Sequence, residues 1–391
     1  MKRSTDRILT THAGSLPRPE GLREIVGAKS AGQPYDEVDL ARRLQSGVAD
    51  IVKQQVDSGI DIVNDGELSK TGFSDYVQER MGGLETRPSR AYASRIAGRD
   101  VSEFPGYFDE TTGFPGGRQR PTGLARMLVS CISPLSYTGQ ASVQSDIGNF
   151  KPALQGVAVE ESFLPAIAPG TIEHWLQNEH YPDDESFLFA IADAMKTEYK
   201  AIVDAGFILQ IDDPGLGETW DMLIPHPTLE EYRKLQTMYV EALNHALNGI
   251  PEDRVRYHLC WGSWQGPHLG DLSLRDVVDL VLSVNAQAYS IEAANPRHSW
   301  EWKVWEDVKL PDNKVLIPGV IAHTTAVVEH PETVAERIIN YARVVGKEMV
   351  IAGADCGFAQ GALYARQHLS IMWAKFEALA EGARLATQRL K

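Results

Sequence analysis

The sequence predicts a single α/β domain with the (β/α)8 (TIM) barrel fold. Eight short apolar runs alternate with amphipathic helical segments along the 391 residues. Such alternation implies parallel strands joined by right-handed crossovers. Polar side chains also gather directly after the strands, which is where this fold builds its sites. The length would also accommodate two medium domains, but with no internal repeat or low-complexity tract we treat residues 1–391 as one domain.

The predicted strands are short apolar runs, and most of them lead into a polar residue or a turn. The first strand is followed by Gly14-Ser15-Leu16-Pro17-Arg18-Pro19, whose prolines stop any regular element. The strands are expected over residues 8–13, 61–64, 163–168, 207–211, 255–261, 288–291, 314–320 and 349–352. Helices are expected over residues 36–58, 184–206, 229–247, 274–284, 331–345 and 370–390.

Residues 80–150 differ in texture from the rest of the chain. They are rich in Gly, Pro and Arg, as in the run at residues 114–118, and contain one strand-like stretch, Met127 to Ile132. A long segment of this kind inside a compact domain usually has a functional reason. We therefore expect an insertion after the second strand, with a hairpin and a loop that acts as a lid or as a docking surface.

The composition argues against two kinds of partner. A net charge of -15 and a pI near 5.2 argue against sequence-independent nucleic-acid binding, which needs a basic surface. No apolar run is long enough to span a bilayer. The N-terminal residues also lack the apolar core of a secretory signal, so we expect a cytoplasmic protein. The sequence leaves the oligomeric state open, and a homo-oligomer is one of the alternatives.

The sequence has three widely spaced cysteines, Cys131, Cys260 and Cys356, which do not indicate a disulfide framework. In a reducing compartment such a sparse, odd set leaves metal binding or catalysis open. Cys131 lies on the strand-like stretch of the expected insertion, beside Ser130 and Ser133, and we assign it to packing.

The strand over residues 255–261 carries the pair that suggests chemistry. Residues i and i+2 of a strand point to the same face, so His258 and Cys260 lie side by side while Leu259 faces away. A thiolate and an imidazole on one face form half of a zinc site. The alternative is a buried cysteine that packs as a small hydrophobe next to an unrelated histidine.

Further polar residues raise the weight of the metal interpretation, because they also follow strands and a barrel converges strand ends on one mouth. A zinc ion held by His258, Cys260, Glu292 and Cys356 would have four mixed ligands. Taken one at a time, Glu292 could instead be a salt-bridged carboxylate and Cys356 a buried thiol. No P-loop, complete dinucleotide fingerprint or nucleophile elbow competes with this interpretation. The other polar residues after strands are Glu67, Asp212 and His323.

The order of these motifs resembles the catalytic barrel of cobalamin-independent methionine synthase. The resemblance covers most of the chain apart from residues 80–150, and the proposed zinc ligands are its most specific part. The motifs that carry it are the run at residues 10–17, Asp65-Gly66-Glu67, Gln210-Ile211-Asp212-Asp213-Pro214, His258-Leu259-Cys260, Ser290-Ile291-Glu292 and Asp355-Cys356-Gly357. It implies a fold like that of uroporphyrinogen decarboxylase and methionine synthase, with a Zn²⁺ cofactor.

The resemblance also implies roles for the remaining residues. Ser15, Glu67 and Asp212 would hold homocysteine, the two carboxylates by charge-assisted hydrogen bonds to its ammonium group. Zinc lowers the pKa of a thiol, so the substrate would react as a thiolate that takes a methyl group to give methionine. His323 could act as a general acid that protonates the departing group; otherwise it is a hydrogen-bonded supporting residue.

Two departures leave the methyl donor open. Full-length enzymes of this type carry two barrels, whereas this chain has room for one, and residues 319–323 lack the family's Asp. Single-barrel relatives include methionine synthases thought to use a cobalamin source. They also include epoxyalkane:coenzyme M transferases, so an alternative is the joining of another thiol to an epoxide. The expected partners are a small thiol and an alkyl donor, such as methylcobalamin or a carrier protein. Arg297 could bind an anionic end of the substrate, but it also fits a plain surface residue.

Two other classes of function remain as alternatives. A decarboxylase-type barrel would leave His258, Cys260 and Cys356 without a task, and metal content separates it from the thiol transferases. A non-enzymatic protein that binds a corrinoid or methyl carrier is separated from them by turnover with a purified methyl donor.

Overall fold

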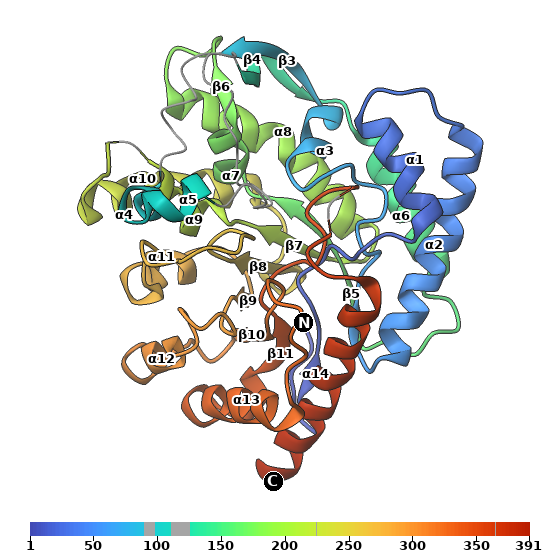
Figure 1. The fold of residues 1–391 in the computed structure, drawn as a ribbon, viewed down its shortest axis with the longest axis vertical. Helices are drawn as coiled ribbons and strands as arrows, with labels where there is room; N and C mark the ends of the chain where they lie inside the picture. The colour runs from blue at the N-terminus through green and yellow to red at the C-terminus, as the bar shows by residue number, and fades with distance from the viewer. Residues whose placement is uncertain (90–97, 111–125, 224, 364) are drawn as a thin grey trace.

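The computed structural model describes residues 1–89, 98–110, 126–223, 225–363 and 365–391. It confirms the predicted barrel (Figure 1): eight parallel strands are hydrogen-bonded in the order β1-β11-β10-β9-β8-β7-β5-β2. Each lies within a residue or two of a predicted strand, although the first two are shorter than expected. The strands are β1 (Leu9–Thr10), β2 (Ile62–Val63), β5 (Glu161–Ile167), β7 (Ile208–Asp212), β8 (Val255–Leu259), β9 (Ala288–Ile291), β10 (Val315–Ile321) and β11 (Ile351–Ala354).

Backbone and side-chain hydrogen bonds join β1 and β2, the first and last strands of this order. The Asp61 backbone N–H donates to Thr10 O at 3.1 Å, and the Thr11 hydroxyl donates to Ile62 O at 3.0 Å. The Asp61 carboxylate accepts a further bond of 2.9 Å from the Thr10 N–H. Polar side chains thus replace part of the backbone ladder between β1 and β2, and the barrel is nearly closed.

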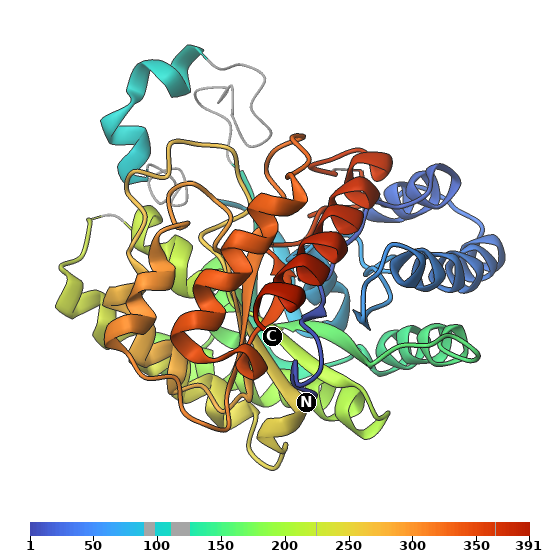
Figure 2. The same ribbon diagram turned by 90° about the horizontal axis from the view of Figure 1, so that it is seen from below.

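A ring of helices covers the outside of the barrel (Figures 1 and 2). Their starts follow ordinary capping rules; at the start of α10, for example, Thr228 and Glu231 form a capping box. Among the described residues no helix is long and apolar enough to cross a membrane. The ring consists of α2 (Glu37–Asp57), α6 (Gln140–Ala153), α8 (Asp184–Asp204), α10 (Leu229–Ala246), α11 (Val278–Leu282), α12 (Val304–Asp307), α13 (Pro331–Val345) and α14 (Leu369–Arg389).

The barrel interior changes from apolar to polar along the strands. Early strand positions form an apolar cluster of their own, separate from the larger core between strands and helices. Further along some of these strands the side chains on the same face become polar, as from Ile208 to Gln210 and Asp212 on β7. Apolar side chains therefore fill the bottom of the barrel, and polar side chains lie near its mouth. The apolar cluster contains Leu9, Ile62, Phe163, Ile208, Ala288, Val315, Ile317 and Ile351.

The segment after β2 contains the expected hairpin. Strands β3 (Met81–Ser89) and β4 (Arg126–Tyr137) pair antiparallel, and β6 (Leu176–Asn178) adds a parallel third strand to β4. Two short helices, α4 (Arg99–Glu103) and α5 (Pro105–Glu110), stand away from the barrel body in Figure 2. The glycine-rich run at residues 114–118 lies outside the described residues.

The end of this segment differs from the expectation that it extends to residue 150. Residues 140–153 form α6, which packs against α2 and α8 and takes the place of the barrel helix after β2. Its buried positions, Val143, Asp146, Ile147 and Phe150, have helical spacing. The aspartate on that face weakened the apolar pattern. It is accommodated because Arg80 forms an ion pair with it at 2.6 Å.

Candidate functional site

Three ligand-type side chains converge at the mouth of the barrel. His258 lies on β8, Cys260 follows that strand, and Cys356 follows β11. Their ligand atoms all lie within 4.8 Å of one another, and the two Sγ atoms are 3.8 Å apart. Two sulfurs at about 2.3 Å from one tetrahedral zinc ion would be separated by about 3.8 Å. The spacing of these three residues, which we call the metal group, therefore fits a single metal ion.

The orientation of His258 also fits a metal ligand. Its Nδ1 lies 3.2 Å from the Ser290 hydroxyl, while its Nε2 is buried and has no hydrogen-bond partner. Burial, with the nearby charge of Arg256, lowers the pKa of His258 to about 3, so the ring is neutral. Buried polar atoms are normally satisfied. A neutral imidazole with one free nitrogen is the form that binds a metal.

The Cys260 thiol is protonated when no cation is present. The hydrogen bond to Cys356, followed by burial, raises the pKa of Cys260 well above its usual range. The charge of Glu292 acts in the same direction. A bound divalent cation reverses this balance, because it stabilises the thiolate form of its ligands. The donor set of nitrogen and two sulfurs suits zinc.

Glu292 lies beside this group but is not one of the three residues whose ligand atoms cluster within 4.8 Å. Its side chain is buried, and both carboxylate oxygens already accept hydrogen bonds. Oε2 accepts from the Trp261 N–H at 3.0 Å, and Oε1 accepts from Asn295 Nδ2 at 2.9 Å. Each oxygen keeps a second lone pair. The role of fourth ligand therefore stays a prediction.

The turn after β1 packs against both the loop that carries Cys356 and the carboxylate of Glu67. A Cβ on Gly357, the residue after Cys356, would lie 2.1 Å from Ser15 Oγ, and a Cβ on Gly14 would lie 2.6 Å from Glu67 Oε1. Ser15 therefore packs against the metal-ligand loop, while its neighbour packs against the predicted amine-binding carboxylate. Both glycines are required because any side chain would occupy this contact.

Glu67 is held in an unusual conformation. Its φ of 54° is one of two positive values among the described non-glycine residues. Lys70 lies 3.0 Å from Glu67 Oε2 and donates to Pro165 O at 2.8 Å. Strained residues of this kind are common at binding sites. The lysine neutralises part of the negative charge that two buried carboxylates would otherwise create.

Asp212 is the second of these carboxylates. It accepts a 2.6 Å bond from Gln210 Nε2. Burial, together with the charge of Glu67, raises the pKa of Asp212 well above its usual range. An added ammonium group would stabilise the ionised carboxylate and oppose this effect.

His323 is fully buried near the metal group. Its Nε2 lies 2.7 Å from Ser263 Oγ, and its Nδ1 has no hydrogen-bond partner. Burial lowers its pKa well below the usual value, and the charge of Arg366 acts in the same direction. The side chain is therefore neutral at pH 7. This differs from the imidazolium expected of a strong general acid, because burial disfavours the charged form.

A further acid near the metal group was missed by the sequence analysis. Glu218 lies on α9 (Gly215–Met222), is partly buried, and has a buried Oε1 with no hydrogen-bond partner. Burial raises its pKa to about 7, and its charge contributes to the raised pKa of Cys260. The available signal was Gly217, where a Cβ would lie 2.6 Å from Cys260 O. This glycine allows α9 to pack closely against the backbone at Cys260.

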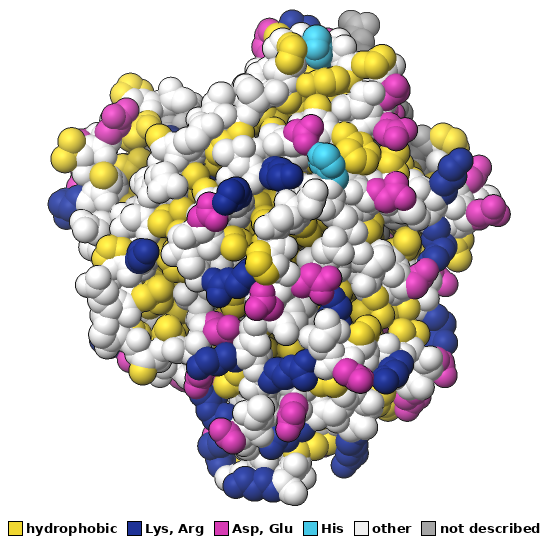
Figure 3. Space-filling view, turned by 180° about the vertical axis from the view of Figure 1, so that it is seen from behind, with side chains coloured by type: hydrophobic (Ala, Val, Ile, Leu, Met, Phe, Trp, Pro, Cys, Tyr) yellow, Lys and Arg dark blue, Asp and Glu magenta, His cyan; other side chains and the backbone are white. Residues whose placement is uncertain are grey.

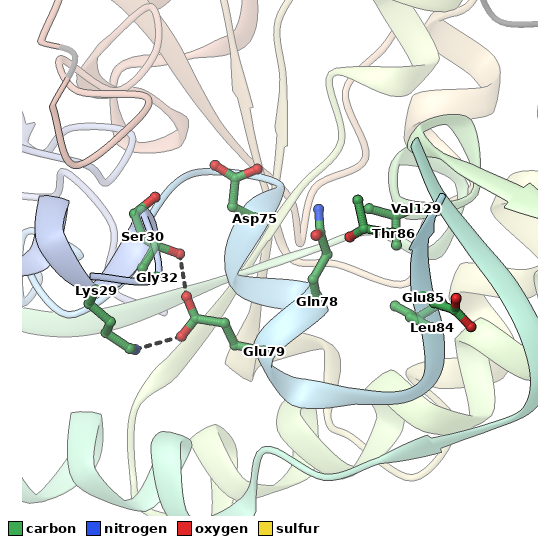
Figure 4. A pocket seen from close by; sticks show the side chains of 11 residues that line it. Lys29, Ser30, Gly32, Asp75, Gln78, Glu79, Leu84, Glu85, Thr86 and Val129 are labelled. Carbon is green, nitrogen blue, oxygen red and sulfur yellow. Dashed lines mark hydrogen bonds and ion pairs between the residues drawn. The ribbon is translucent and has the colours of Figure 1, made fainter. Parts of the chain in front are cut away.

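An open pocket of about 650 Å³ lies away from the predicted site residues, between α1 (Glu20–Ser30), α3 (Asp75–Arg80) and the hairpin (Figure 4). Its lining is polar, and Glu79 bonds both Lys29 Nζ at 2.5 Å and the Thr71 hydroxyl at 2.6 Å. No residue of the predicted site lines this pocket. On the molecular face in Figure 3, basic and acidic side chains are interspersed.

Comparison with known proteins decides the family. A sequence model of the cobalamin-independent synthase catalytic domain matches residues 165–374, more than half of the chain. The chain belongs to this family. The matched region contains Asp212, Glu218 and the whole metal group.

Relatives named methionine synthase match the chain over nearly its whole length. A methionine synthase from Saccharolobus islandicus is 27% identical over 387 residues, covering 98% of this chain and 96% of the relative. A methionine synthase from Sulfurisphaera tokodaii is 24% identical, covering 98% and 93%. Both alignments therefore extend over nearly the whole length of each protein.

Solved structures support the fold. A B12-independent methionine synthase from Shewanella sp. W3-18-1, in complex with selenomethionine, has a TM-score of 0.72 at 18% identity, covering 98% of this chain and 99% of that chain. A putative vitamin-B12 independent methionine synthase from Listeria monocytogenes has a TM-score of 0.65 at 19% identity, covering 97% and 98%.

Proposed function

We propose that this chain is a zinc-dependent methyltransferase that converts homocysteine to methionine. The observation that carries the proposal is the metal group, with two sulfurs 3.8 Å apart beside a neutral, buried and partnerless His258 nitrogen. Membership of the cobalamin-independent synthase family supports the methyl transfer, and the relatives named methionine synthase support homocysteine as the acceptor.

The chain's residues would divide the work between the two ends of the substrate. His258, Cys260 and Cys356 would hold the ion, with Glu292 as the fourth ligand. Bound zinc would lower the pKa of the substrate thiol and keep it as a thiolate at neutral pH. Glu67 and Asp212 would bind the ammonium group, and Ser15 would also contact the substrate.

The reaction then needs one displacement. The substrate sulfur forms a bond to the methyl carbon, and the bond between this carbon and the donor breaks with its electrons leaving on the donor. His323 is proposed to stabilise donors that leave as a basic group, which take their proton from solvent. In its neutral form it would act as a hydrogen-bond donor, with Ser263 as its partner.

Metal content tests the proposal directly. The purified chain should hold about one zinc ion, as expected for a single four-ligand site. Cys260→Ser and Cys356→Ser should each lose zinc and activity together. Cys131→Ser is the matched control, because this buried thiol bonds Ser133 O in the hairpin sheet and lies outside the metal group. Full zinc occupancy in both site variants would refute the metal centre.

A screen of thiols against donors tests the reaction. Zinc-loaded protein should methylate homocysteine from methylcobalamin, methyltetrahydrofolate or a carrier-bound methyl group. The alternative function, alkylation of a thiol such as coenzyme M by an epoxide, predicts turnover without an amino group on the thiol. Preference for a thiol that lacks this group would favour the alternative and would leave Glu67 and Asp212 without their proposed role.

A further inference from the structure

Four ionisable side chains form a buried cluster next to the metal group, although none of them is a predicted ligand. They are His268 and Asp271 in the loop after β8, and His298 and Glu301 after β9. Their side chains are at most 6% exposed. A buried ionic cluster of this size is costly unless each charge is paired. Its position beside the site raises the question of what it holds in place.

His298 is the centre of this cluster. Its Nε2 lies 2.9 Å from Asp271 Oδ2, and its Nδ1 lies 3.0 Å from Glu301 Oε2. An ionised carboxylate only accepts hydrogen bonds, so the ring donates from both nitrogens and is an imidazolium. Burial alone would lower the pKa of His298, but the bonds to these two carboxylates raise it to about 10. The side chain is therefore a fixed cation.

This cation lies flat against Trp261. The ring centroids are 3.9 Å apart and the planes are inclined by 20°. A cation on the face of an indole is favourable, more so when both are desolvated. The Trp261 indole N–H also donates to Leu272 O at 2.6 Å. The indole is thus held both on its face and at its edge.

Trp261 connects the cluster to two predicted metal ligands. It directly follows Cys260 in the chain, and its backbone N–H donates to Glu292 Oε2 at 3.0 Å. A rotation of the Trp261 peptide would therefore change the direction of the Cys260 side chain and release the Glu292 carboxylate. Both positions depend on an indole that His298 holds.

The other carboxylate contacts fasten the loop that follows Trp261. Asp271 Oδ2 also lies 2.7 Å from His268 Nδ1, and His268 Nε2 lies 3.1 Å from Trp264 O. Glu301 Oε1 accepts from the Leu274 N–H at 2.8 Å. The same loop carries Ser263, the partner of His323. The cluster thus holds both ends of the loop beside the metal group.

We propose that His298 is a positioning residue of the metal centre, which acts through Trp261 to fix Cys260 and Glu292. The inference rests on the proposed zinc function. Hydrogen-bonded residues behind metal ligands typically change metal affinity or activity by about 10- to 100-fold when they are replaced. His298 differs from such a residue in that it contacts no ligand itself and works through the stacked indole.

The test compares His298→Gln with the parent chain in zinc affinity, by competition with a chelator, and in the absorption spectrum of the cobalt-substituted protein. Glutamine keeps an N–H donor but loses the charge and the ring face. We expect zinc affinity to fall by about 10- to 100-fold, with shifted cobalt and thiolate-to-cobalt bands. His245→Gln is the matched control, since His245 pairs with Asp193 at 2.6 Å on the exposed surface of α10 and α8.

If His298→Gln does not fold, Asp271→Asn takes its place under the same criterion, because it keeps an acceptor oxygen and removes one charge. Unchanged zinc affinity and an unchanged cobalt spectrum in the folded variant would overturn the inference. Equal spectral changes in His245→Gln would overturn it as well. A parent chain that binds no zinc would instead refute the proposed function, so the two failures are distinguishable.

Discussion

Asp212 and His258 are register partners on the neighbouring strands β7 and β8. The Asp213 N–H donates to His258 O at 2.8 Å just beyond this pair, so the two strands stay joined at the mouth. A predicted amine-binding carboxylate therefore lies one strand away from a predicted metal ligand. A short amino-thiol could reach both groups at once, which makes the two ends of the site separable by mutation.

The first prediction is that Asp212→Asn selectively weakens binding of thiols that carry an amino group. Loss of a hydrogen bond to a charged group costs roughly 1.5–3 kcal/mol, which corresponds to about a 10- to 150-fold loss of homocysteine affinity. Binding of 4-mercaptobutyrate, which lacks the amino group, should stay unchanged. The measurement is calorimetry or product formation with both thiols on zinc-loaded protein.

The pH dependence gives this prediction a second readout. Because burial and the charge of Glu67 raise the pKa of Asp212, the carboxylate is ionised only above its usual range. Homocysteine affinity, relative to 4-mercaptobutyrate, should therefore rise with pH in the parent chain and vary less in Asp212→Asn. Equal affinity of parent and variant for homocysteine at every pH would remove Asp212 from the amine site.

The second prediction concerns the turn after β1. Gly14 has a φ of +136°, and an added Cβ would lie 2.6 Å from Glu67 Oε1. Gly14→Ala should therefore displace this carboxylate and weaken homocysteine binding by about tenfold or more, in keeping with a lost charged contact. Gly32→Ala is the matched control, because Gly32 also has a positive φ, +64°, but nothing lies within 4 Å of its Cβ position.

Both alanine variants should lose stability, because an L-residue is strained at positive φ. Only Gly14→Ala should change the KM for homocysteine. If Gly32→Ala changed this KM by the same factor, general strain rather than contact with Glu67 would explain the effect. Thermal unfolding of the two variants gives the stability comparison.

The third prediction concerns Glu218 and the stability of the zinc-free chain. Burial raises its pKa from the ordinary 4.5 to about 7. The folded state therefore binds more protons than the unfolded state between these values, and stability falls as the pH rises through this window. The difference corresponds to about 3 kcal/mol at most.

Glu218→Gln should therefore stabilise the chelator-treated protein at pH 8 relative to the parent, with a smaller gain or a loss at pH 5. Urea unfolding at both pH values measures the difference. Burial also raises the pKa of Asp65 to about 7. Because Asp65 is present in both proteins, the difference between parent and variant reports Glu218. The same stability difference at pH 5 and pH 8 would show that the carboxyl group does not titrate as described.

The barrel could be predicted from sequence because its signal is local. Each strand is an apolar run that leads toward the polar residues of the mouth, and the period of two alone places His258 and Cys260 on one face. The convergence of Cys260 with Cys356 follows from barrel closure, which brings together strands far apart in sequence. Fold class and metal group were therefore accessible before the structure.

Other features depend on partners that sequence does not reveal. The helix α6 was hidden because Asp146 lies on its buried face, where Arg80 and the Ser69 hydroxyl are its partners. Lys70 gave no signal as the partner of Glu67, and the neutral state of His323 follows from complete burial rather than from residue type. The cluster around His298 combines two loops whose proximity only the fold establishes.

The last prediction concerns α4, a helix of the insertion that contacts α9 and the loop after β8. The Arg99 guanidinium lies 3.9 Å from the Trp220 ring centroid and donates to Trp220 O and Pro227 O at 3.2 Å each. Asp100 Oδ1 accepts from the Gly270 N–H at 2.7 Å, in the loop that also carries Ser263. These contacts fasten the insertion onto two elements that adjoin the metal group.

Arg99→Ala should loosen this attachment without removing zinc. Loss of the cation–π contact, worth about 0.5–2 kcal/mol, should speed amide hydrogen exchange over residues 98–110. If α4 shields the reacting thiolate from water, methyl transfer should slow with every donor alike. The control is Arg42→Ala, which removes an exposed ion pair on α2 and should change neither the exchange rate nor the transfer rate. A loss confined to a carrier-bound donor would mark α4 as a docking surface instead. Unchanged rates with all donors, despite faster exchange, would make the insertion a passive feature of the surface.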